Sequence, residues 1–263
     1  MSQQPALIVA AGVEKVYASP RGNIRAISGV DLEIRDGEFV SILGPSGCGK
    51  STLLKCMGGL EAVTAGRITV RGQPVVEPPA DCGFVFQRDL LLDWRSVLDN
   101  VMLPAEFLRL DLRKLRPRAQ ELLDTLDIGP ASGRYPWELS GGMRQRVAIC
   151  RTLLLDPQLL LMDEPFGALD AITRDELNME LERIWERTRK TVALVTHSIS
   201  EAVFLSDRVI VMDKNPGRVA GIVDIDLPRP RTLAIRETPE FAAYMRQLRS
   251  IFEAFGIMRR AAA

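Results

Sequence analysis

The stretch GPSGCGKST, residues 44–52, decides the fold of this chain. It fits the pattern G-x-x-x-x-G-K-[ST], and it lies between the apolar run FVSIL, residues 39–43, and the helix-like run STLLKCMGGL, residues 51–60. Glycines allow backbone N–H groups to converge on phosphate oxygens, and the positive end of the following helix dipole adds to the attraction. The pattern therefore predicts a strand, a phosphate-binding loop and a helix.

The residue types in this loop predict how it binds a nucleotide and a magnesium ion. Lys50 is expected to neutralise the β- and γ-phosphates, and the hydroxyl of Ser51 is expected to ligate Mg²⁺. The alternative is a glycine-rich turn without a ligand, which the flanking strand and helix patterns disfavour. The predicted nucleotide-binding residues are Gly44, Pro45, Ser46, Gly47, Cys48, Gly49, Lys50, Ser51 and Thr52.

Two carboxylates end a later apolar run, LLLMDEP, residues 159–165. Asp163 is expected to hold Mg²⁺ through its water shell, and Glu164 is placed to polarise an attacking water. A solvated strand end that carries two acids is the alternative interpretation. The phosphate-binding loop in the same chain favours the metal and water roles.

The apolar patterns predict an α/β fold. Short runs rich in Val and Ile occupy the first 45 residues and predict an antiparallel sheet that leads into a core strand. Apolar residues spaced three and four apart predict helices between residues 96 and 155, and strand and helix patterns then alternate as in a parallel sheet. We predict one domain, 1–263, in which 1–95 and 156–263 form the catalytic core with the β subdomain and 96–155 form an inserted helical subdomain.

Composition excludes some classes of function. The chain has 34 basic and 34 acidic residues, and this zero net charge does not favour nucleic acid as a partner. No uncharged apolar run approaches the roughly 18 residues that span a bilayer, and residues 1–12 lack the pattern of a signal peptide, so we expect a soluble cytoplasmic chain. The four cysteines have no metal-ligand spacing and are expected to be reduced, mostly buried thiols.

A second predicted anion site lies in ELSGGMRQRVAICRTLLL, residues 138–155. Ser140, Gly141 and Gly142 precede a helix, so their exposed amides and the helix dipole attract negative charge. The segment LSGGMRQR resembles the signature motif of ATP-binding cassette (ABC) ATPases, and the order of motifs between Val9 and Arg231 agrees with that family. The resemblance implies a P-loop NTPase core in which two chains face each other head to tail.

The resemblance also implies roles for single residues. His197, the only histidine of the chain, matches the family's switch histidine beside the γ-phosphate, and Gln87 matches the loop glutamine that contacts Mg²⁺ and the attacking water. Tyr17 is placed like the aromatic residue that stacks on adenine, and Asp170, at the end of GALD, lies in a loop that crosses the dimer interface. A buried core histidine and an ordinary strand-end tyrosine are the alternatives.

Taken together, these expectations define three groups of site residues. The catalytic group is Glu164, His197 and Gln87, and the metal group is Ser51, Gln87 and Asp163. The signature residues that cover the ATP of the partner chain are Leu139, Ser140, Gly141, Gly142 and Met143.

Several segments are similar to the ATPase subunits of bacterial importers for nitrate, sulfonates and taurine, among them LDWRSVLDNV at residues 92–101 and IDLPRPR at residues 225–231. Asp93 stands where that subgroup usually has proline. The resemblance implies a peripheral ATPase at the cytoplasmic face of the cell membrane. Its expected partners are a second ATPase subunit, giving a homodimer, two membrane permease subunits and a periplasmic solute-binding protein.

Two alternatives stay open at this point. A non-transport P-loop ATPase or a small-molecule kinase would use the same phosphate-binding loop, and the solute could be nitrate, an alkanesulfonate, taurine, an aromatic acid or a thiamine-precursor pyrimidine. Leu90, Leu91, Leu92 and Trp94 are predicted to form an exposed apolar patch for a membrane subunit, with ordinary core as the alternative.

Overall fold

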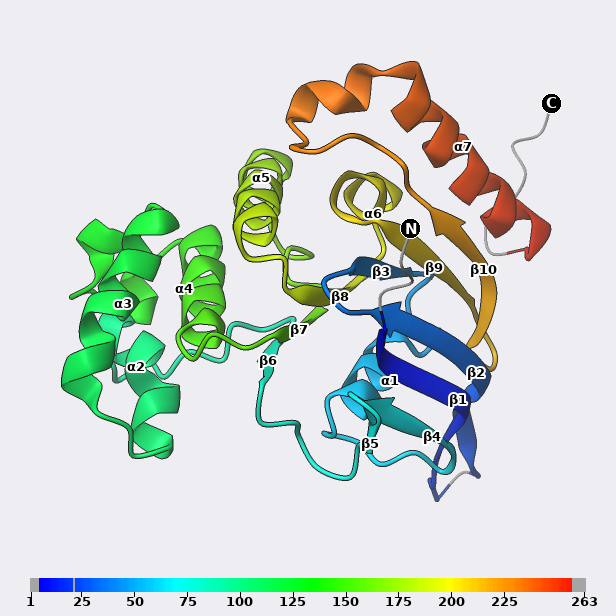
Figure 1. Cartoon of the computed structure of the whole chain (residues 1–263), viewed down its shortest axis with the longest axis horizontal. Helices are drawn as coiled ribbons and strands as arrows, with labels where there is room; N and C mark the ends of the chain where they lie inside the picture. The colour runs from blue at the N-terminus through cyan, green and yellow to red at the C-terminus, as the bar shows by residue number, and fades with distance from the viewer. Residues whose placement is uncertain (1–4, 21, 257–263) are drawn as a thin grey trace.

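The computed structural model describes residues 5–20 and 22–256, in which two sheets lie next to each other (Figure 1). The smaller sheet has the order β2-β1-β4-β5 with every pair antiparallel, and the larger has the order β10-β9-β3-β8-β7-β6, in which β10 alone is antiparallel to its neighbour. The predicted α/β class with an N-terminal antiparallel sheet is confirmed. The smaller sheet comprises β1 Ala6–Tyr17, β2 Ile24–Arg35, β4 Ala65–Val70 and β5 Gln73–Pro74; the larger comprises β3 Phe39–Leu43, β6 Cys82–Val85, β7 Leu159–Asp163, β8 Thr191–Thr196, β9 Arg208–Asp213 and β10 Arg218–Asp224.

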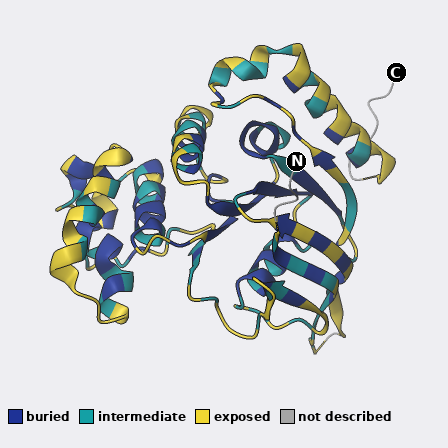
Figure 2. Ribbon diagram, viewed as in Figure 1, coloured by how far each residue is buried: buried dark blue, intermediate teal, exposed yellow. Residues whose placement is uncertain are grey.

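The central strands β3, β7 and β8 of the larger sheet are buried on both faces, and this explains why their residues are mostly apolar. Successive side chains of a strand point to opposite faces, so Phe39 packs toward helices α5 Ala171–Thr188 and α6 Ile199–Leu205, whereas Val40 packs toward helix α1 Lys50–Met57. The strands at its centre are dark blue throughout in Figure 2. The smaller sheet packs on the α1 side of this core.

Three helices form an arm on the left of Figure 1, away from the sheets. They are α2 Val97–Phe107, α3 Leu112–Thr125 and α4 Gly141–Leu153, joined through the short 3₁₀ turns Gly129–Ala131 and Pro136–Glu138. A polar side chain caps each helix at its first turn: Ser96, Asp111 and Ser140. The helices predicted within 96–155 are therefore present, and the domain boundaries on either side of them stay a prediction.

The last segment returns over α6. A 3₁₀ helix, Leu233–Glu237, leads to α7 Pro239–Ala254, and the buried guanidinium of Arg231 donates hydrogen bonds to the carbonyls of Val203, Phe204 and Ser206 at the end of α6. These carbonyls have no partner within the helix, so the arginine caps it. Within residues 5–20 and 22–256, no helix is both long enough and apolar enough to cross a bilayer.

The cysteine prediction is confirmed. All four thiols are free; Cys48, Cys56 and Cys150 are buried, and Cys82 is half-buried. The signal-peptide expectation extends over residues 1–4, which lie outside the described residues.

Candidate functional site

The phosphate-binding loop runs from the end of β3 to the start of α1, as its sequence predicts. Gly47 and Gly49 adopt left-handed backbone angles, with φ of 77° and 95°, which side chains rarely tolerate. A Cβ atom on Gly44 would lie 2.7 Å from the carbonyl oxygen of Met212, and one on Gly49 would lie 2.7 Å from that of Ala26. The glycines therefore let the loop backbone pack directly against the carbonyls of Met212 and Ala26, and they add no side chain to the inside of the loop.

The side chain of Lys50 is buried inside this loop. Its ammonium donates hydrogen bonds to the carbonyls of Gly44 at 2.9 Å and Pro45 at 3.0 Å, and it lies 3.5 Å from Oε1 of Glu164. A buried ammonium needs such partners, because an unpaired one would lose its solvation without compensation. The loop thus holds one positive charge where the phosphates of a nucleotide are expected.

Two oxygen ligands for a metal ion meet beside Lys50. The Ser51 hydroxyl donates to Oδ1 of Asp163 at 2.6 Å, although the two residues are 112 positions apart in the chain. Burial raises the pKa of the Asp163 carboxyl, and the Ser51 hydrogen bond opposes that shift. Hydroxyl and carboxylate oxygens are the ligand types that Mg²⁺ prefers, so this pair fits the ion.

A pocket of about 310 Å³ opens over these groups. Gln87 and Glu164 line it together with the loop, as does Ala26 of β2, which no sequence pattern had indicated. Among the described residues, Lys50, Ser51, Gln87 and Glu164 thus line one cavity, whereas Asp163 reaches it only through its hydrogen bond with Ser51 and His197 lines an adjoining hollow with Glu164.

His197 and Glu164 face each other at the ends of adjacent parallel strands. Nδ1 of the imidazole is 3.3 Å from Oε2 of the carboxylate, and half of the histidine side chain is exposed. Glu164 has φ of 43°, a strained value for a residue with a side chain, and its amide donates to the carbonyl of Val195 in the next strand. This strand-to-strand bond fixes the backbone that carries the carboxylate.

The signature residues lie apart from this pocket, at the start of α4. Ser140 and Gly141 are exposed and Leu139 and Met143 are half-buried, whereas Gly142 is buried, and a Cβ there would lie 2.5 Å from Cγ2 of Thr173 on α5. Neither they nor Asp170 lines the phosphate pocket among the described residues.

Asp170 has a local role that the sequence analysis missed. Its carboxylate accepts hydrogen bonds from the amides of Ile172 and Thr173, both at 3.1 Å, and from the Thr173 hydroxyl at 2.7 Å. These bonds lower the pKa of Asp170, the amide of Thr173 contributing most. Asp170 therefore caps α5, and its place in a dimer interface stays a prediction. Tyr17, half-buried at the end of β1, has the Lys15 ammonium 4.8 Å from its ring centroid, and its contact with adenine also stays a prediction.

The loop after Gln87 is fastened to α4 by two arginines that the sequence analysis did not identify. Nε of Arg144 is 2.8 Å from Oδ2 of Asp89, and the guanidinium of Arg151 donates to the carbonyls of Asp89 and Leu90. Burial opposes ionisation of Asp89, but the hydrogen bonds from Arg144 and from the Leu91 amide, together with the charges of Arg144 and Arg151, hold the pKa of Asp89 below its usual range. These contacts join the Gln87 loop to the helix that begins with the signature.

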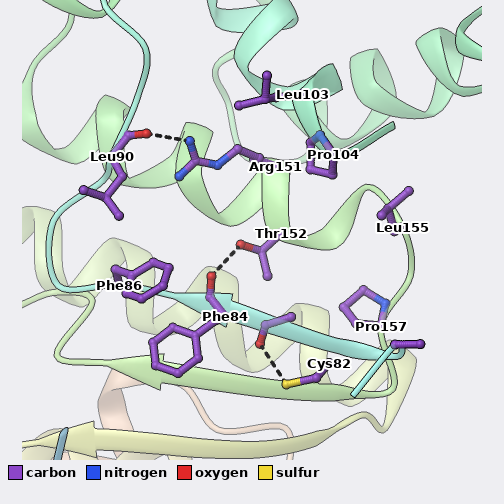
Figure 3. Close-up of a pocket in the computed structure, with 12 residues that line it drawn as sticks. Cys82, Phe84, Phe86, Leu90, Leu103, Pro104, Arg151, Thr152, Leu155 and Pro157 are labelled. Atoms are coloured by element: carbon purple, nitrogen blue, oxygen red, sulfur yellow. Dashed lines mark hydrogen bonds between the residues drawn. The ribbon is translucent and has the colours of Figure 1, made fainter. Parts of the chain in front are cut away.

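A second pocket, of about 390 Å³, lies between β6, α2 and α4 (Figure 3). Its lining is mostly apolar and includes Phe84, Phe86, Leu103 and Leu155, with Arg151 bound to the carbonyl of Leu90 at its rim. Because the cavity is open and apolar, it suits a protruding apolar side chain of another protein.

The predicted apolar patch beside this pocket is partly wrong. Leu90 and Trp94 are 51% and 74% exposed, as predicted, but Leu91 is only 8% exposed and belongs to the core, and Leu92 is half-buried. The cause is Asn100, whose buried amide bonds to both the N–H and the C=O of Leu92 and holds this irregular segment against α2.

The fold and site together define a P-loop nucleoside triphosphatase with an added signature helix. The family model described as ABC transporter matches residues 27–167, and the chain belongs to the ABC transporter family. It binds and hydrolyses ATP, the activity of the family's ATP-binding subunits.

Relatives extend over nearly the whole chain. The taurine import ATP-binding protein TauB of Rhizobium johnstonii is 45% identical over 91% of this chain and 93% of its own. The nitrate import ATP-binding protein NrtD of Synechococcus elongatus is 44% identical over 88% of this chain and 85% of its own. A solved structure, a dimeric post-hydrolysis state of an ATP-binding cassette bound to ADP and Pi, is similar with a TM-score of 0.75 and 34% identity, covering 84% of this chain and 100% of that one.

Proposed function

We propose that this chain is the ATP-hydrolysing subunit of a multi-subunit bacterial importer for a small solute of the nitrate, sulfonate or taurine class. The observation that carries the proposal is that the chain has two helix N-termini suited to bind anions, those of α1 and α4, and that they lie apart from each other. The start of α1 has the lysine, the metal ligands and the carboxylate beside it, whereas the start of α4, where Ser140 and Gly141 are exposed, does not line that pocket among the described residues. Two chains arranged head to tail would complete each other's site.

Within one site, each side chain has a task that its position supports. Lys50 neutralises phosphate charge, and Ser51, Asp163 and Gln87 would hold Mg²⁺, which would supply further charge neutralisation at the phosphates. Glu164 accepts a proton from the attacking water, because it lines the same pocket and its carboxylate is held between Lys50 and His197. His197 orients that carboxylate through its Nδ1 contact and leaves its other ring nitrogen for the terminal phosphate.

The partner chain contributes the signature segment 139–143 and the loop that ends at Asp170. Positive ends of helix dipoles and free amides stabilise the charge that grows on phosphate oxygens during hydrolysis. The similar cassette solved with ADP and Pi is dimeric, which supports a homodimer here.

The apolar pocket of Figure 3 is the proposed contact with the two membrane permease subunits. Leu90 lines this pocket, and the exposed Trp94 follows it by four residues in the loop that also carries Gln87, so a docked permease segment would be connected to the hydrolysis site. The permeases would hold the chain at the cytoplasmic face of the cell membrane, and a periplasmic solute-binding protein would deliver the solute. Nothing in the matched relatives supports a small-molecule kinase or a non-transport ATPase.

Co-purification with two hydrophobic membrane subunits tests this function. Trp94→Ala should weaken assembly and spare the basal ATPase of the detached subunit, since the side chain is 74% exposed and contributes little to folding. Arg246→Ala, on the exposed side of α7, is the control and should assemble normally. A chain that hydrolyses ATP but binds no membrane subunit, or that transfers phosphate to a small molecule, would contradict the proposal.

Gly141→Asp tests the site completed in trans. A side chain fits at Gly141, whose Cβ would lie 3.7 Å from Leu169, and its negative charge would repel the phosphates of a partner's nucleotide. ATP binding to the monomer should persist and hydrolysis should stop. Equal loss of binding and hydrolysis, in a folded variant, would place the signature of each chain in its own site.

A further inference from the structure

The turn between α2 and α3 exposes a cluster of large apolar side chains. Phe107, Leu108, Leu110 and Leu112 are 78%, 61%, 43% and 39% exposed, within six consecutive residues at the end of the helical arm. Single exposed apolar residues are ordinary on a protein surface, but a contiguous group of this kind marks a contact site. We call residues 107–116 the basic apolar turn.

Basic side chains alternate with these apolar ones. Arg109, Arg113, Lys114 and Arg116 are all exposed, and in the part of the chain that the structure describes only Lys114 has a carboxylate within 4 Å, that of Asp111 at 3.9 Å. The other two charged residues nearby, Glu106 and Arg118, are already paired with Arg95 and Asp156 outside the turn. Four cations and one anion thus give the turn a charge of +3 on a chain whose net charge is zero.

The turn continues the surface that we assign to the membrane subunits. Leu103 and Pro104 of α2 line the pocket of Figure 3, and Phe107 follows Leu103 by four residues, which places it on the same side of the helix one turn further on. A surface that faces permeases also faces the bilayer in which they lie. This orientation rests on the proposed function, whereas the exposure and the charge of the turn do not.

We propose that the basic apolar turn binds the anionic phospholipid headgroups of the inner leaflet. Its composition, cations interleaved with exposed Phe and Leu, is the composition of segments that lie in a membrane interface, where the cations meet phosphate groups and the apolar side chains enter the acyl boundary. Each cation near an anionic surface strengthens binding about fivefold, which corresponds to about 1 kcal/mol. An acidic protein surface is the alternative partner. It would pair with the cations, but it would not bury the four neighbouring apolar side chains.

Vesicle sedimentation with the full-length chain tests this proposal. The chain should bind vesicles of phosphatidylglycerol and phosphatidylethanolamine, bind phosphatidylcholine vesicles much more weakly, and lose most binding at high salt. The triple variant Arg113→Gln, Lys114→Gln and Arg116→Gln should lower the partition coefficient about 100-fold, from about fivefold per side chain. Phe107→Ser should lower binding at high salt, where the apolar contribution remains.

A matched variant separates a local contact from a general effect of charge. Arg183→Gln, Arg246→Gln and Arg249→Gln change the net charge equally, on exposed positions of α5 and α7, which lie apart from the turn between α2 and α3 (Figure 1), and should leave vesicle binding and ATPase activity unchanged. Equal binding by the two triple variants, or no binding by the wild-type chain, overturns the proposal.

Assembly with the membrane subunits is measured in parallel. Loss of that assembly by the triple variant, with no vesicle binding by the wild-type chain, makes the turn a protein contact and also overturns the proposal. Vesicle binding is measured with the chain alone and needs no permease partner. Failure of lipid binding can therefore be distinguished from failure of the proposed importer function.

Discussion

A side chain added at Gly142 should destabilise this chain through one methyl group of Thr173. The Cβ of Gly142→Ala would lie 2.5 Å from Cγ2 of Thr173, a distance that packed carbon atoms do not adopt. Thr173 cannot easily turn away, because its χ1 is stiff and its hydroxyl is bonded to Asp170 at 2.7 Å. Either α4 or α5 must therefore shift.

The size of the effect follows from opposing contributions. Overpacking costs about 1–3 kcal/mol, and replacing glycine by alanine in a helix returns up to about 1 kcal/mol, so we expect a net loss of about 0.5–2 kcal/mol. Thr173→Ser keeps the hydroxyl that bonds Asp170 and removes only the colliding methyl group, at a cost of up to about 0.8 kcal/mol. In the Thr173→Ser background, Gly142→Ala should then be neutral or stabilising.

Urea unfolding of the four proteins in the double-mutant cycle measures this prediction. The coupling free energy between the two sites should be about 1–3 kcal/mol, with unchanged m-values. Effects that add to within about 0.5 kcal/mol would show that no such collision occurs. The same geometry means that Gly142→Asp is a poor probe of the anion site, because it disturbs the packing of α4 on α5, and Gly141→Asp is the cleaner variant.

Three further predictions concern the chemistry of the site. Lys50→Ala should weaken ATP binding about 10- to 100-fold, because a hydrogen bond to a charged group contributes about 1.5–3 kcal/mol; unaltered affinity in a fluorescent-ATP titration would contradict the phosphate role. Glu164→Gln should leave magnesium-ATP uncleaved and hold two chains together in size-exclusion chromatography, and in that dimer the NMR signals of the single His197 ring should shift on adding nucleotide; a persistent monomer, or unmoved signals, would count against the arrangement. Burial raises the pKa of Cys82 to about 12, so its alkylation by iodoacetamide should be slow at about pH 8 and rise about tenfold per pH unit as the thiolate fraction grows, whereas a flat rate would refute the shift.

The sequence predicts those parts of the fold that are determined by residues close together in the chain. The turn glycines and the following Lys50 produce a loop and a helix within a dozen residues, and the caps Ser96 and Ser140 begin helices that they themselves stabilise. The strands β3, β7 and β8 are buried throughout and mostly apolar because both faces of the sheet are covered there, and a mostly apolar run can be recognised in the sequence before its neighbours are known.

What the sequence could not predict depends on distant contacts. Strands β4 and β6 carry only weak patterns and are fixed by pairing with β1 and β7, so neither was identified. The direction in which Leu91 points depends on Asn100, and the contact of Ser51 with Asp163 depends on the order of strands in the sheet. Resemblance to a family implied roles for Gln87 and His197, but only the structure shows that Gln87 lines the phosphate pocket and that His197 lies beside Glu164 in an adjoining hollow.

The arginine contacts between α4 and the loop after Gln87 have a mechanical consequence. Arg144 and Arg151 bind both the side chain and the backbone of Asp89, so the loop has no slack relative to the helix. A displacement of Asp89 and Leu90 would therefore be passed to α4, the helix that begins with the signature residues. In the head-to-tail pair of chains that we propose, a displacement of this loop in one subunit would thus move the signature residues that cover the nucleotide of the other subunit.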